Sequence, residues 1–388
     1  MSLITADFIF DGYGFLPNGT GLNISDDGVI QEIFQHNGSL DVKHYKGLLM
    51  PGMINAHCHL ELSHLRGKVE AKKGLVPFLL SVVGNRENYS AAEKGIAIEL
   101  AESEMVRNGI VAVGDICNGL DTLLQKKKQM LTYRSFVECS GLNDEKGAEL
   151  FYSGKKKQEE YEKHGNSSLA LHAPYSISNT LIKYVDEDSV GRITTIHNQE
   201  CADENVLFLE KKGSFLQLFD AIHFDKDDFE IENKSSLQTY LPKFTHQQKI
   251  ILVHNTFASE EDIVYANALG KEIYWCVCAK ANLYIEDRLP DVEMMMRNHC
   301  EIVLGTDSLA SNDTLSIWEE IKTIHQHKPN IPLERMLQWA TSNGARALGM
   351  DSTIGSIAIG KKPGIVNIAL NKIEELPIST KRNVEVLF

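Results

Sequence analysis

The chain of 388 residues lacks the features that mark several broad classes of protein. No stretch approaches the ~18 consecutive apolar residues that a membrane-spanning helix requires. The segment from Met1 to Phe10 includes Asp7 and lacks the basic flank and apolar run of a secretory signal peptide. The sequence therefore predicts a cytoplasmic protein with no membrane partner.

Positive charge and paired cysteines are also scarce. The formal net charge of −14 repels the phosphates of nucleic acids and of anionic lipids, so nucleic acid is not expected as a partner. The seven cysteines are scattered and odd in number, which is typical of reduced thiols and not of a disulfide framework. With 43% hydrophobic and 24% charged residues, the composition indicates a globular protein with a sizeable core.

What the chain does contain is an alternation of apolar, strand-like segments with amphipathic helical ones. Eight such units over ~300 residues are typical of a (β/α)8 TIM barrel, so residues 51–350 are predicted to form a barrel catalytic domain of the α/β class. The predicted strands are 49–59, 110–116, 131–138, 169–172, 193–197, 249–254, 272–277 and 301–306.

Short β-rich runs punctuated by glycine flank this region. They include 6–10 and 29–34 before it, and 353–360 and 364–370 after it. After the last strand–helix unit and before the run 353–360, residues 332–349 are predicted to form a helix that begins at a proline and ends at a glycine. Residues 1–50 and 351–388 are predicted to pair into one small β-sandwich beside the barrel.

Histidines and acidic residues stand where the predicted strands end. The carboxyl ends of barrel strands meet at one face, where the active sites of this fold lie. Because His57 and His59 are two positions apart in one strand, they point to the same side and can bind one metal ion. The strand ends carry His57, His59, Asp115, Glu138, His172, His197, His254, Cys276 to Cys278 and Asp307.

Catalytic zinc sites use imidazole and carboxylate ligands and keep one position open for water. Among the strand ends, His57, His59, His197 and Asp307 form such a set. They predict one divalent metal ion, with zinc favoured and iron(II) as the alternative. For Asp307 taken alone, a turn or helix-cap role is the alternative.

A hydrolytic metal site also needs a group that transfers protons. Glu200 lies three residues beyond His197, on the first turn after that strand, and is predicted to be this group. Stabilisation of a helix start is the alternative for Glu200. His254 either binds the metal or hydrogen-bonds the attacking water, unless it is an inert neighbour of the site.

Several motifs resemble the amidohydrolase superfamily, specifically its cytosine deaminase, chlorohydrolase and nucleoside-deaminase branch. They occur in the family's order over nearly the whole chain. The motifs are Pro-Gly-Met-Ile-Asn-Ala-His-Cys-His-Leu at 51–60, Leu-His-Ala-Pro-Tyr-Ser at 171–176, Ile-His-Asn-Gln-Glu at 196–200, Leu-Val-His-Asn at 252–255 and Gly-Thr-Asp-Ser at 305–308.

By this resemblance, the metal ligands are His57, His59, His197 and Asp307. The resemblance also implies the roles of three further groups. Glu200 would be the proton shuttle, His254 would orient or deprotonate the water with help from Asp307, and His172 would contact the substrate. The fourth strand ends in His172 and has no lysine there, whereas binuclear members need one, so a single metal ion is implied.

Two loops carry the remaining predictions. Residues 60–67 loosely resemble the loop after the first strand of aminofutalosine deaminases, where Glu61 and Arg66 would reach the substrate; a surface ion pair is the alternative. Residues 278–282 read Cys-Ala-Lys-Ala-Asn where the family often has Cys-Pro-x-Ser-Asn. The loop after the seventh strand is therefore expected to differ in shape.

The sequence thus predicts a hydrolase that acts on carbon–nitrogen bonds, a deaminase that releases ammonia from an amino-substituted nitrogen heterocycle or a nucleoside-like compound. Another hydrolase of this scaffold, acting on a carbon–halide, carbon–sulfur or cyclic amide bond, is the nearest alternative. A catalytically silent metal- or ligand-binding relative is the second. The expected partner is the small heterocyclic substrate, and a homodimer is left open.

Overall fold

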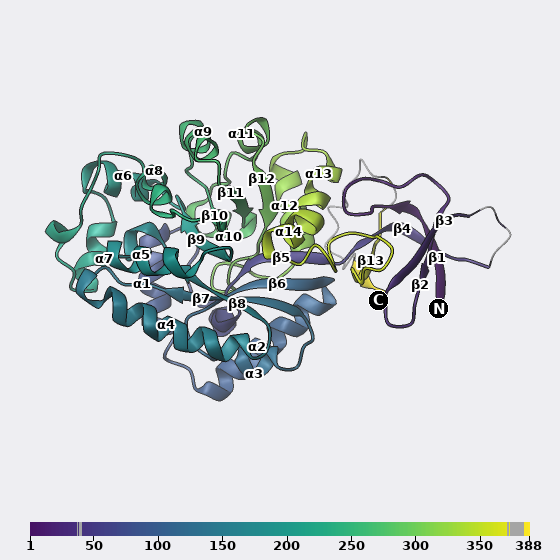
Figure 1. The fold of residues 1–388 in the computed structure, drawn as a ribbon, viewed down its shortest axis with the longest axis horizontal. Helices are drawn as coiled ribbons and strands as arrows, with labels where there is room; N and C mark the ends of the chain where they lie inside the picture. The colour runs from purple at the N-terminus through teal and green to yellow at the C-terminus, as the bar shows by residue number, and fades with distance from the viewer. Residues whose placement is uncertain (37, 39–40, 371, 373–383) are drawn as a thin grey trace.

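The computed structural model describes residues 1–36, 38, 41–370, 372 and 384–388. It shows an α/β fold whose larger part contains two four-stranded parallel sheets (Figure 1). The sheets have the orders β5-β6-β7-β8 and β9-β10-β11-β12, and their strands correspond to the eight predicted ones. Their bounds are β5 (Met53–Cys58), β6 (Ile110–Cys117), β7 (Thr132–Cys139), β8 (Asn166–Leu171), β9 (Ile193–Asn198), β10 (Lys249–His254), β11 (Glu272–Val277) and β12 (Glu301–Leu304).

Backbone hydrogen bonds also link the outer strands of the two sheets. The N–H of His197 on β9 donates to the carbonyl oxygen of His172, which follows β8, at 2.9 Å. The N–H of Thr306, after β12, donates to the carbonyl oxygen of His57 on β5 at 3.0 Å. Both contacts lie at the carboxyl ends of strands, so they bring the ends of both sheets together on one face.

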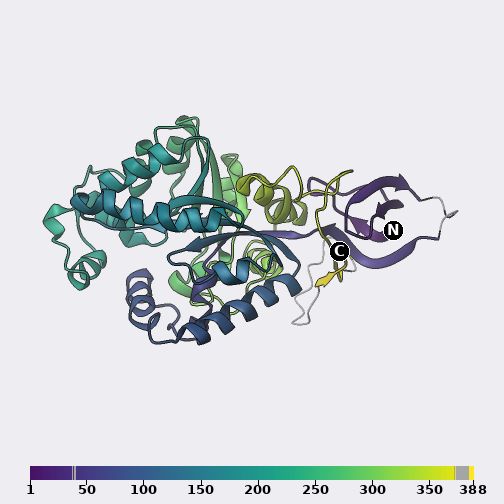
Figure 2. The ribbon, with the colours of Figure 1, turned by 60° about the horizontal axis from the view of Figure 1, so that its bottom comes forward.

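Helices lie along the outer sides of the parallel strands (Figure 2). They begin where the sequence offers capping groups: Ser90 and Ser259 each form a capping box that satisfies the first N–H groups of α2 and α9. The helices are α1 (Leu75–Asn85), α2 (Ala91–Arg107), α3 (Leu123–Lys126), α4 (Gly147–Glu162), α5 (Asn179–Asp188), α6 (Ala202–Glu210), α7 (Phe215–Ala221), α8 (Ser236–Tyr240), α9 (Glu260–Ala268), α10 (Ala279–Glu286), α11 (Val292–Arg297), α12 (Ile317–His327), α13 (Leu333–Gln338) and α14 (Gly344–Leu348).

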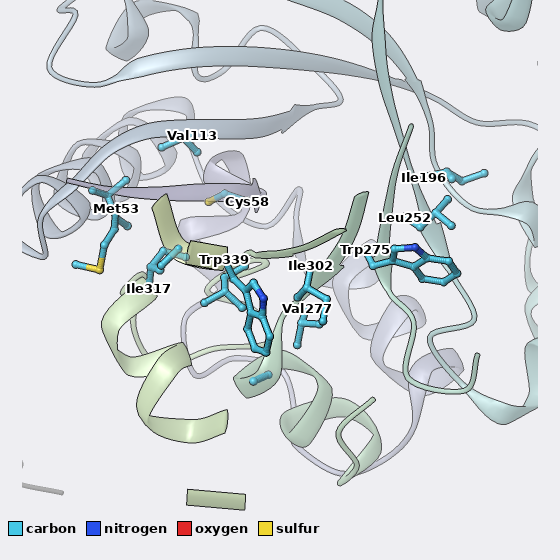
Figure 3. Close-up of a cluster of buried hydrophobic side chains, with 14 of the residues drawn as sticks. Met53, Cys58, Val113, Ile196, Leu252, Trp275, Val277, Ile302, Ile317 and Trp339 are labelled. Carbon is cyan, nitrogen blue, oxygen red and sulfur yellow. The ribbon is translucent and has the colours of Figure 1, made fainter. Parts of the chain in front are cut away.

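The hydrophobic core fills the space between these helices and the sheets. Ile196, Leu252 and Trp275 come from the neighbouring strands β9, β10 and β11 and pack side by side (Figure 3). Trp339, just after α13, is only 4% exposed and belongs to the same cluster. Close packing of this kind holds the strand ends in fixed positions, which a site assembled from several strands requires.

Strands from both ends of the chain form a third sheet, which lies at one end of the molecule (Figure 1). Its order is β14-β13-β4-β1-β2-β3, in which β13 from the C-terminal region pairs with β4 from the N-terminal region. Among the described residues this is one sheet, and the two-layered sandwich and the domain boundaries stay predictions. The strands are β1 (Ser2–Ile9), β2 (Thr20–Ile24), β3 (Ile30–Gln35), β4 (Lys43–Pro51), β13 (Ile365–Ile368) and β14 (Val384–Val386).

The predicted strand at 353–360 is wrong. Gly355 and Gly360 have φ of +81° and +85°, so the chain turns at both, and Ile354 and Ile357 are buried from turns. The predicted helix at 332–349 is present as α13, a turn of π-helix and α14, ending at Gly349. Residues 371 and 373–383, within the predicted sandwich, lie outside the described residues.

None of the helices in the described ranges has both the length and the apolar composition of a membrane span.

Candidate metal centre and active site

The predicted ligands of β5 meet the segment after β12. His57 and His59 are both buried, and the Nε2 atom of each lies 3.6 Å from Oδ1 of Asp307. The backbone makes this possible, because the N–H of Asp307 donates to the carbonyl oxygen of His57 at 3.1 Å. Two residues that are some 250 positions apart in the chain are thereby held side by side.

His197 joins this group from β9. Its Nε2 lies 3.2 Å from Nε2 of His59. Its Nδ1 donates to the carbonyl oxygen of His172 at 2.6 Å, which places the proton on Nδ1 and leaves the lone pair of Nε2 facing the other ligands. Burial lowers the pKa of His197 to about 4, so the ring is neutral, as a metal ligand must be.

The spacing of these atoms fits a divalent metal ion. With bonds of 2.0–2.2 Å, neighbouring donors of a tetrahedral site lie ~3.3–3.6 Å apart, and the separations here are 3.2 and 3.6 Å. Both ring nitrogens of His57 and Nδ1 of His59 are buried without a hydrogen-bond partner among the described residues. A metal ion would satisfy the nitrogens that face it and remove part of this cost.

Donor atoms of His57, His59 and Asp307 lie within 4.8 Å of one another, and so do those of His57, His197 and His254. The two groups share His57. The structure therefore brings the four predicted ligands together, with His254 beside them.

Asp307 is held as a carboxylate. Burial alone would raise the pKa of its carboxyl group, but the neighbouring histidines, His57 first, hold that pKa well below the usual range. The Ser311 hydroxyl donates to its second oxygen, Oδ2. The backbone φ of Asp307 is +56°, in the left-handed region that residues other than glycine seldom adopt, and such strain is typical of functional positions.

Glu200 follows β9 and has the opposite character. Burial, and then the charges of Asp307, Glu204 and Glu286, raise the pKa of Glu200 well above its usual range. Burial thus favours the protonated form of this carboxyl group. Its Oε1 lies 3.5 Å from Nε2 of His254, so an acidic side chain lies next to the ligand group.

Hydrogen bonds to Glu204 hold the turn that carries Glu200. The carboxylate of Glu204, in the first turn of α6, accepts the N–H groups of Gln199 at 3.1 Å and of Glu200 at 3.3 Å. The hydroxyl of Ser236 donates to the same carboxylate at 2.6 Å. Gln199 has a φ of +45°, which turns the chain so that Glu200 projects toward the strand ends.

His254 ends β10 with a φ of +74°. Burial lowers the pKa of its ring well below the usual range. The side-chain amide of Asn282 lies 3.2 Å from its Nδ1 and also donates to the hydroxyl of Thr256 at 2.7 Å. Residues 279–282, expected in a loop, form the first turn of α10, and Asn282 keeps the asparagine of the family motif although the proline is not kept.

A cavity of about 320 Å³ opens above these residues, a volume within the range of small-molecule sites. Its inner end is formed by His59, His197, Glu200, His254 and Asp307. Side chains of α1 and α7 make one wall apolar: Leu75, Phe78, Leu79, Val82, Val83, Leu218 and Ile222. The rest of the lining is mixed: Arg86, Asn118, Glu138, Ser140, His172, Ser176 and Ser308 are polar, and Leu62, Gly141, Leu142 and Tyr175 lie among them.

Of the predicted substrate contacts His172 and Arg66, only His172 lines the cavity. His172 lines the cavity, and its Nδ1 lies 2.6 Å from the hydroxyl of Ser176. Arg66 is not among the lining residues; its side chain is 45% exposed and pairs with Glu104, the surface ion pair that was the alternative.

Glu61 lies behind the cavity wall and not in it. Its carboxylate accepts the N–H groups of Asn118 and Gly119 and lies 3.5 Å from the guanidinium of Arg86. Burial raises the pKa of Glu61 to about 7. Glu61 therefore positions two lining residues.

Sequence reasoning missed Arg86 and Asn118 as lining residues. Asn118 follows β6 directly, so its place at a strand end could have identified it. No local pattern marks Arg86, because it lies just beyond the end of α1 and reaches the cavity only through tertiary packing.

The comparison with known proteins agrees with this geometry. The profile of the amidohydrolase family matches residues 48–387, which include the eight strands of the two parallel sheets and all four candidate metal ligands. The chain belongs to the amidohydrolase family.

Two curated relatives cover most of this amidohydrolase. It is 28% identical to the 5-methylthioadenosine/S-adenosylhomocysteine deaminase of Pyrococcus abyssi over 88% of this chain and 78% of that protein. It is 26% identical to the aminodeoxyfutalosine deaminase of Nitratiruptor sp. over 81% of this chain and 77% of that protein. Among solved structures, Helicobacter pylori aminofutalosine deaminase superimposes with a TM-score of 0.81 at 24% identity, covering 96% of this chain and 94% of that one, and shares its fold.

Proposed function

We propose that this amidohydrolase is a metal-dependent deaminase that hydrolyses the exocyclic carbon–nitrogen bond of an adenosine-type heterocycle and releases ammonia. The observation that carries the proposal is the position of Glu200 and of His254 beside three histidines and one carboxylate, all lining or bordering one cavity. The names of the curated relatives support the adenosine-type substrate.

The scaffold of this site is proposed to be a closed (β/α)8 barrel. The hydrogen bonds of His197 to His172 and of Thr306 to His57 support closure of the two sheets into one ring. The terminal sheet is proposed to be a separate unit made of residues 1–50 and 351–388.

His57, His59, His197 and Asp307 are the residues proposed to hold one divalent ion, zinc rather than iron(II). The solved adenosine deaminase of Xanthomonas campestris, 20% identical with a TM-score of 0.71 over 98% of this chain and 87% of that chain, contains zinc. When bound, such an ion activates water and stabilises the negative charge that develops during hydrolysis. Elemental analysis of the purified protein tests both the identity of the metal and the ratio of one ion per chain.

The chain's own residues supply binding and proton transfer. Glu200 holds a proton on its carboxyl group and passes it to the ring nitrogen next to the reacting carbon. It then receives a proton from the water that adds to that carbon. Glu200 passes this proton to the exocyclic amino group, the carbon–nitrogen bond breaks and ammonia leaves, and the hydroxyl group of the adduct returns a proton to Glu200 as the carbon–oxygen double bond forms. His254 directs the water, and His172 contacts the heterocycle.

We also propose that the protein acts in the cytoplasm on a small-molecule substrate. Light scattering tests whether it assembles as a homodimer.

An ammonia-release screen tests the proposal. Fully metallated protein is assayed with adenosine, 5′-methylthioadenosine, adenine, guanine and cytosine, and metal-free protein serves as the control. Ammonia from at least one adenosine-type compound, only in the metallated sample, is the expected result. Absence of ammonia from all five compounds would refute the deaminase function.

A further inference from the structure

One carboxylate in the cavity has no part in the proposed chemistry. Glu138 is the penultimate residue of β7, its side chain is only 5% exposed, and it lines the cavity together with Asn118. The side-chain amide of Asn118 donates to Oε2 of Glu138 at 3.0 Å. The second oxygen, Oε1, is buried and has no hydrogen-bond partner among the described residues.

No neighbouring protein group satisfies this oxygen. The closest basic atom is Nδ1 of His197, at 3.9 Å, and that N–H already donates to the carbonyl oxygen of His172 at 2.6 Å. A buried carboxylate oxygen without a donor is costly, so it is retained where a ligand supplies the donor.

A second metal ion does not account for Glu138. Its carboxylate lies within 4.8 Å of donor atoms of His172 and His197, which could suggest another cation site. Nδ1 of His197 carries a proton, however, and its Nε2 faces His59 at 3.2 Å. No lone pair of His197 is left for an ion at Glu138.

The surroundings of Glu138 identify the donor. Arg86 is the one Lys or Arg side chain among the described lining residues; Asn118, Ser140, His172 and Ser176 are polar, and side chains of α1 and α7 make an apolar wall. A neutral compound that carries hydroxyl groups fits such a surface, because each hydroxyl can donate to the carboxylate and accept from an amide or hydroxyl.

We propose that Glu138 is the specificity residue that binds the sugar hydroxyls of a nucleoside, so that the enzyme prefers nucleosides to free bases. This inference rests on the proposed deaminase function. Oε1 of Glu138 accepts a hydroxyl hydrogen atom while Asn118 holds Oε2, the base reaches Glu200 and His172, and the apolar wall contacts the parts of the nucleoside that remain.

Glu138→Gln tests the inference without changing the volume of the side chain. In the variant, the amide oxygen keeps the bond from Asn118, and the NH2 group replaces the accepting Oε1. We expect kcat/KM for adenosine to fall about 10- to 100-fold, the effect of losing a hydrogen bond to a charged group. For 2′,3′-dideoxyadenosine, which lacks both hydroxyls, the change should stay below about 3-fold.

Binding provides a measurement that does not depend on turnover. Calorimetry with inosine and 2′,3′-dideoxyinosine should show that wild-type protein prefers inosine and that Glu138→Gln has lost this preference. Glu102→Gln is the matched control, because Glu102 is another buried carboxylate but lies on α2 and does not line the cavity. Its preference for inosine should equal that of the wild type, and unfolding curves verify that both variants are folded.

The outcomes separate the two proposals. Equal losses for both nucleosides in Glu138→Gln, or equal wild-type affinity for inosine and its dideoxy analogue, overturn the hydroxyl-binding role. Ammonia released only from free bases overturns that role as well but leaves the deaminase function standing. Ammonia released from none of the compounds refutes the function itself.

Discussion

Replacing Glu200 by glutamine is the most direct test of the proposed chemistry. Glu200 is only 4% exposed, and its carboxyl group lies 3.5 Å from Nε2 of His254. Glutamine has the same shape and is neutral like the protonated acid, so packing and metal binding are retained while proton transfer is lost. General acid–base catalysis contributes about 10²- to 10⁴-fold, so kcat should fall by that factor, or ~2.7–5.4 kcal/mol.

The same variant has an opposite effect on stability. The pKa of Glu200 is raised by burial first, so the folded protein binds a proton that the unfolded chain, with a carboxyl pKa of ~4.3, releases as the pH rises. Wild-type stability is therefore lost progressively as the pH rises above ~4.3 toward the folded pKa. Metal-free Glu200→Gln should be more stable than metal-free wild type at pH 8, and the difference should vanish near pH 4.

Two assays check these expectations. Steady-state kinetics with determined metal content measures kcat, and urea unfolding of the metal-free proteins at several pH values measures stability. Glu210→Gln, an exposed carboxylate at the end of α6, serves as the control and should change neither. A kcat for Glu200→Gln within about 3-fold of wild type, at full metal content, would show that Glu200 does not carry the proton.

Three further predictions concern the metal, the core and the surface. His57→Ala should reduce bound metal to less than one-tenth of the wild-type content, and removal of the metal by a chelator should lower the midpoint of thermal unfolding; full occupancy in the variant would argue against the ligand assignment. Lys126→Met should lower the free energy of unfolding by ~3–5 kcal/mol, because it leaves the carboxylate of Asp115 buried without its ion pair; a loss below ~1 kcal/mol in urea titrations would contradict this. Arg66→Ala should leave kcat/KM within about 2-fold of wild type, since Arg66 is exposed and pairs with Glu104 away from the cavity, and a larger drop would restore Arg66 as a substrate contact.

The eight parallel strands could be predicted because each is an apolar run of the expected length followed by a helical segment. The error at 353–360 has the same origin. Ile354 and Ile357 produce a strand-like pattern, but Gly355 and Gly360 adopt positive φ and the buried isoleucines come from turns. A pattern of apolar residues predicts which side chains are buried. It does not predict the backbone conformation, which decides whether those residues lie in a strand or in a turn.

The structure brings the four predicted ligands together, whereas only His172 of the three predicted substrate contacts lines the cavity. Arg66 and Arg86 are both arginines near the first helices, and the sequence offers no reason to prefer one of them. In the structure Arg66 pairs with Glu104 at the surface, whereas Arg86 lines the cavity. The difference arises from the path of the chain between η1 (Leu60–Leu65) and α1, which depends on contacts distant in sequence.

The sequence by itself determined which residues stand at the ends of the strands, because side chains alternate along a strand and the pattern stops where the strand does. It thereby determined that His57 and His59 share one side. Only the tertiary structure decided that His59 and His197, 138 residues apart, lie 3.2 Å from each other, and that Oε1 of Glu138 is left without a donor. Distances between strands depend on how the sheets and helices pack together, and this information is spread over the whole chain instead of being contained in any one motif.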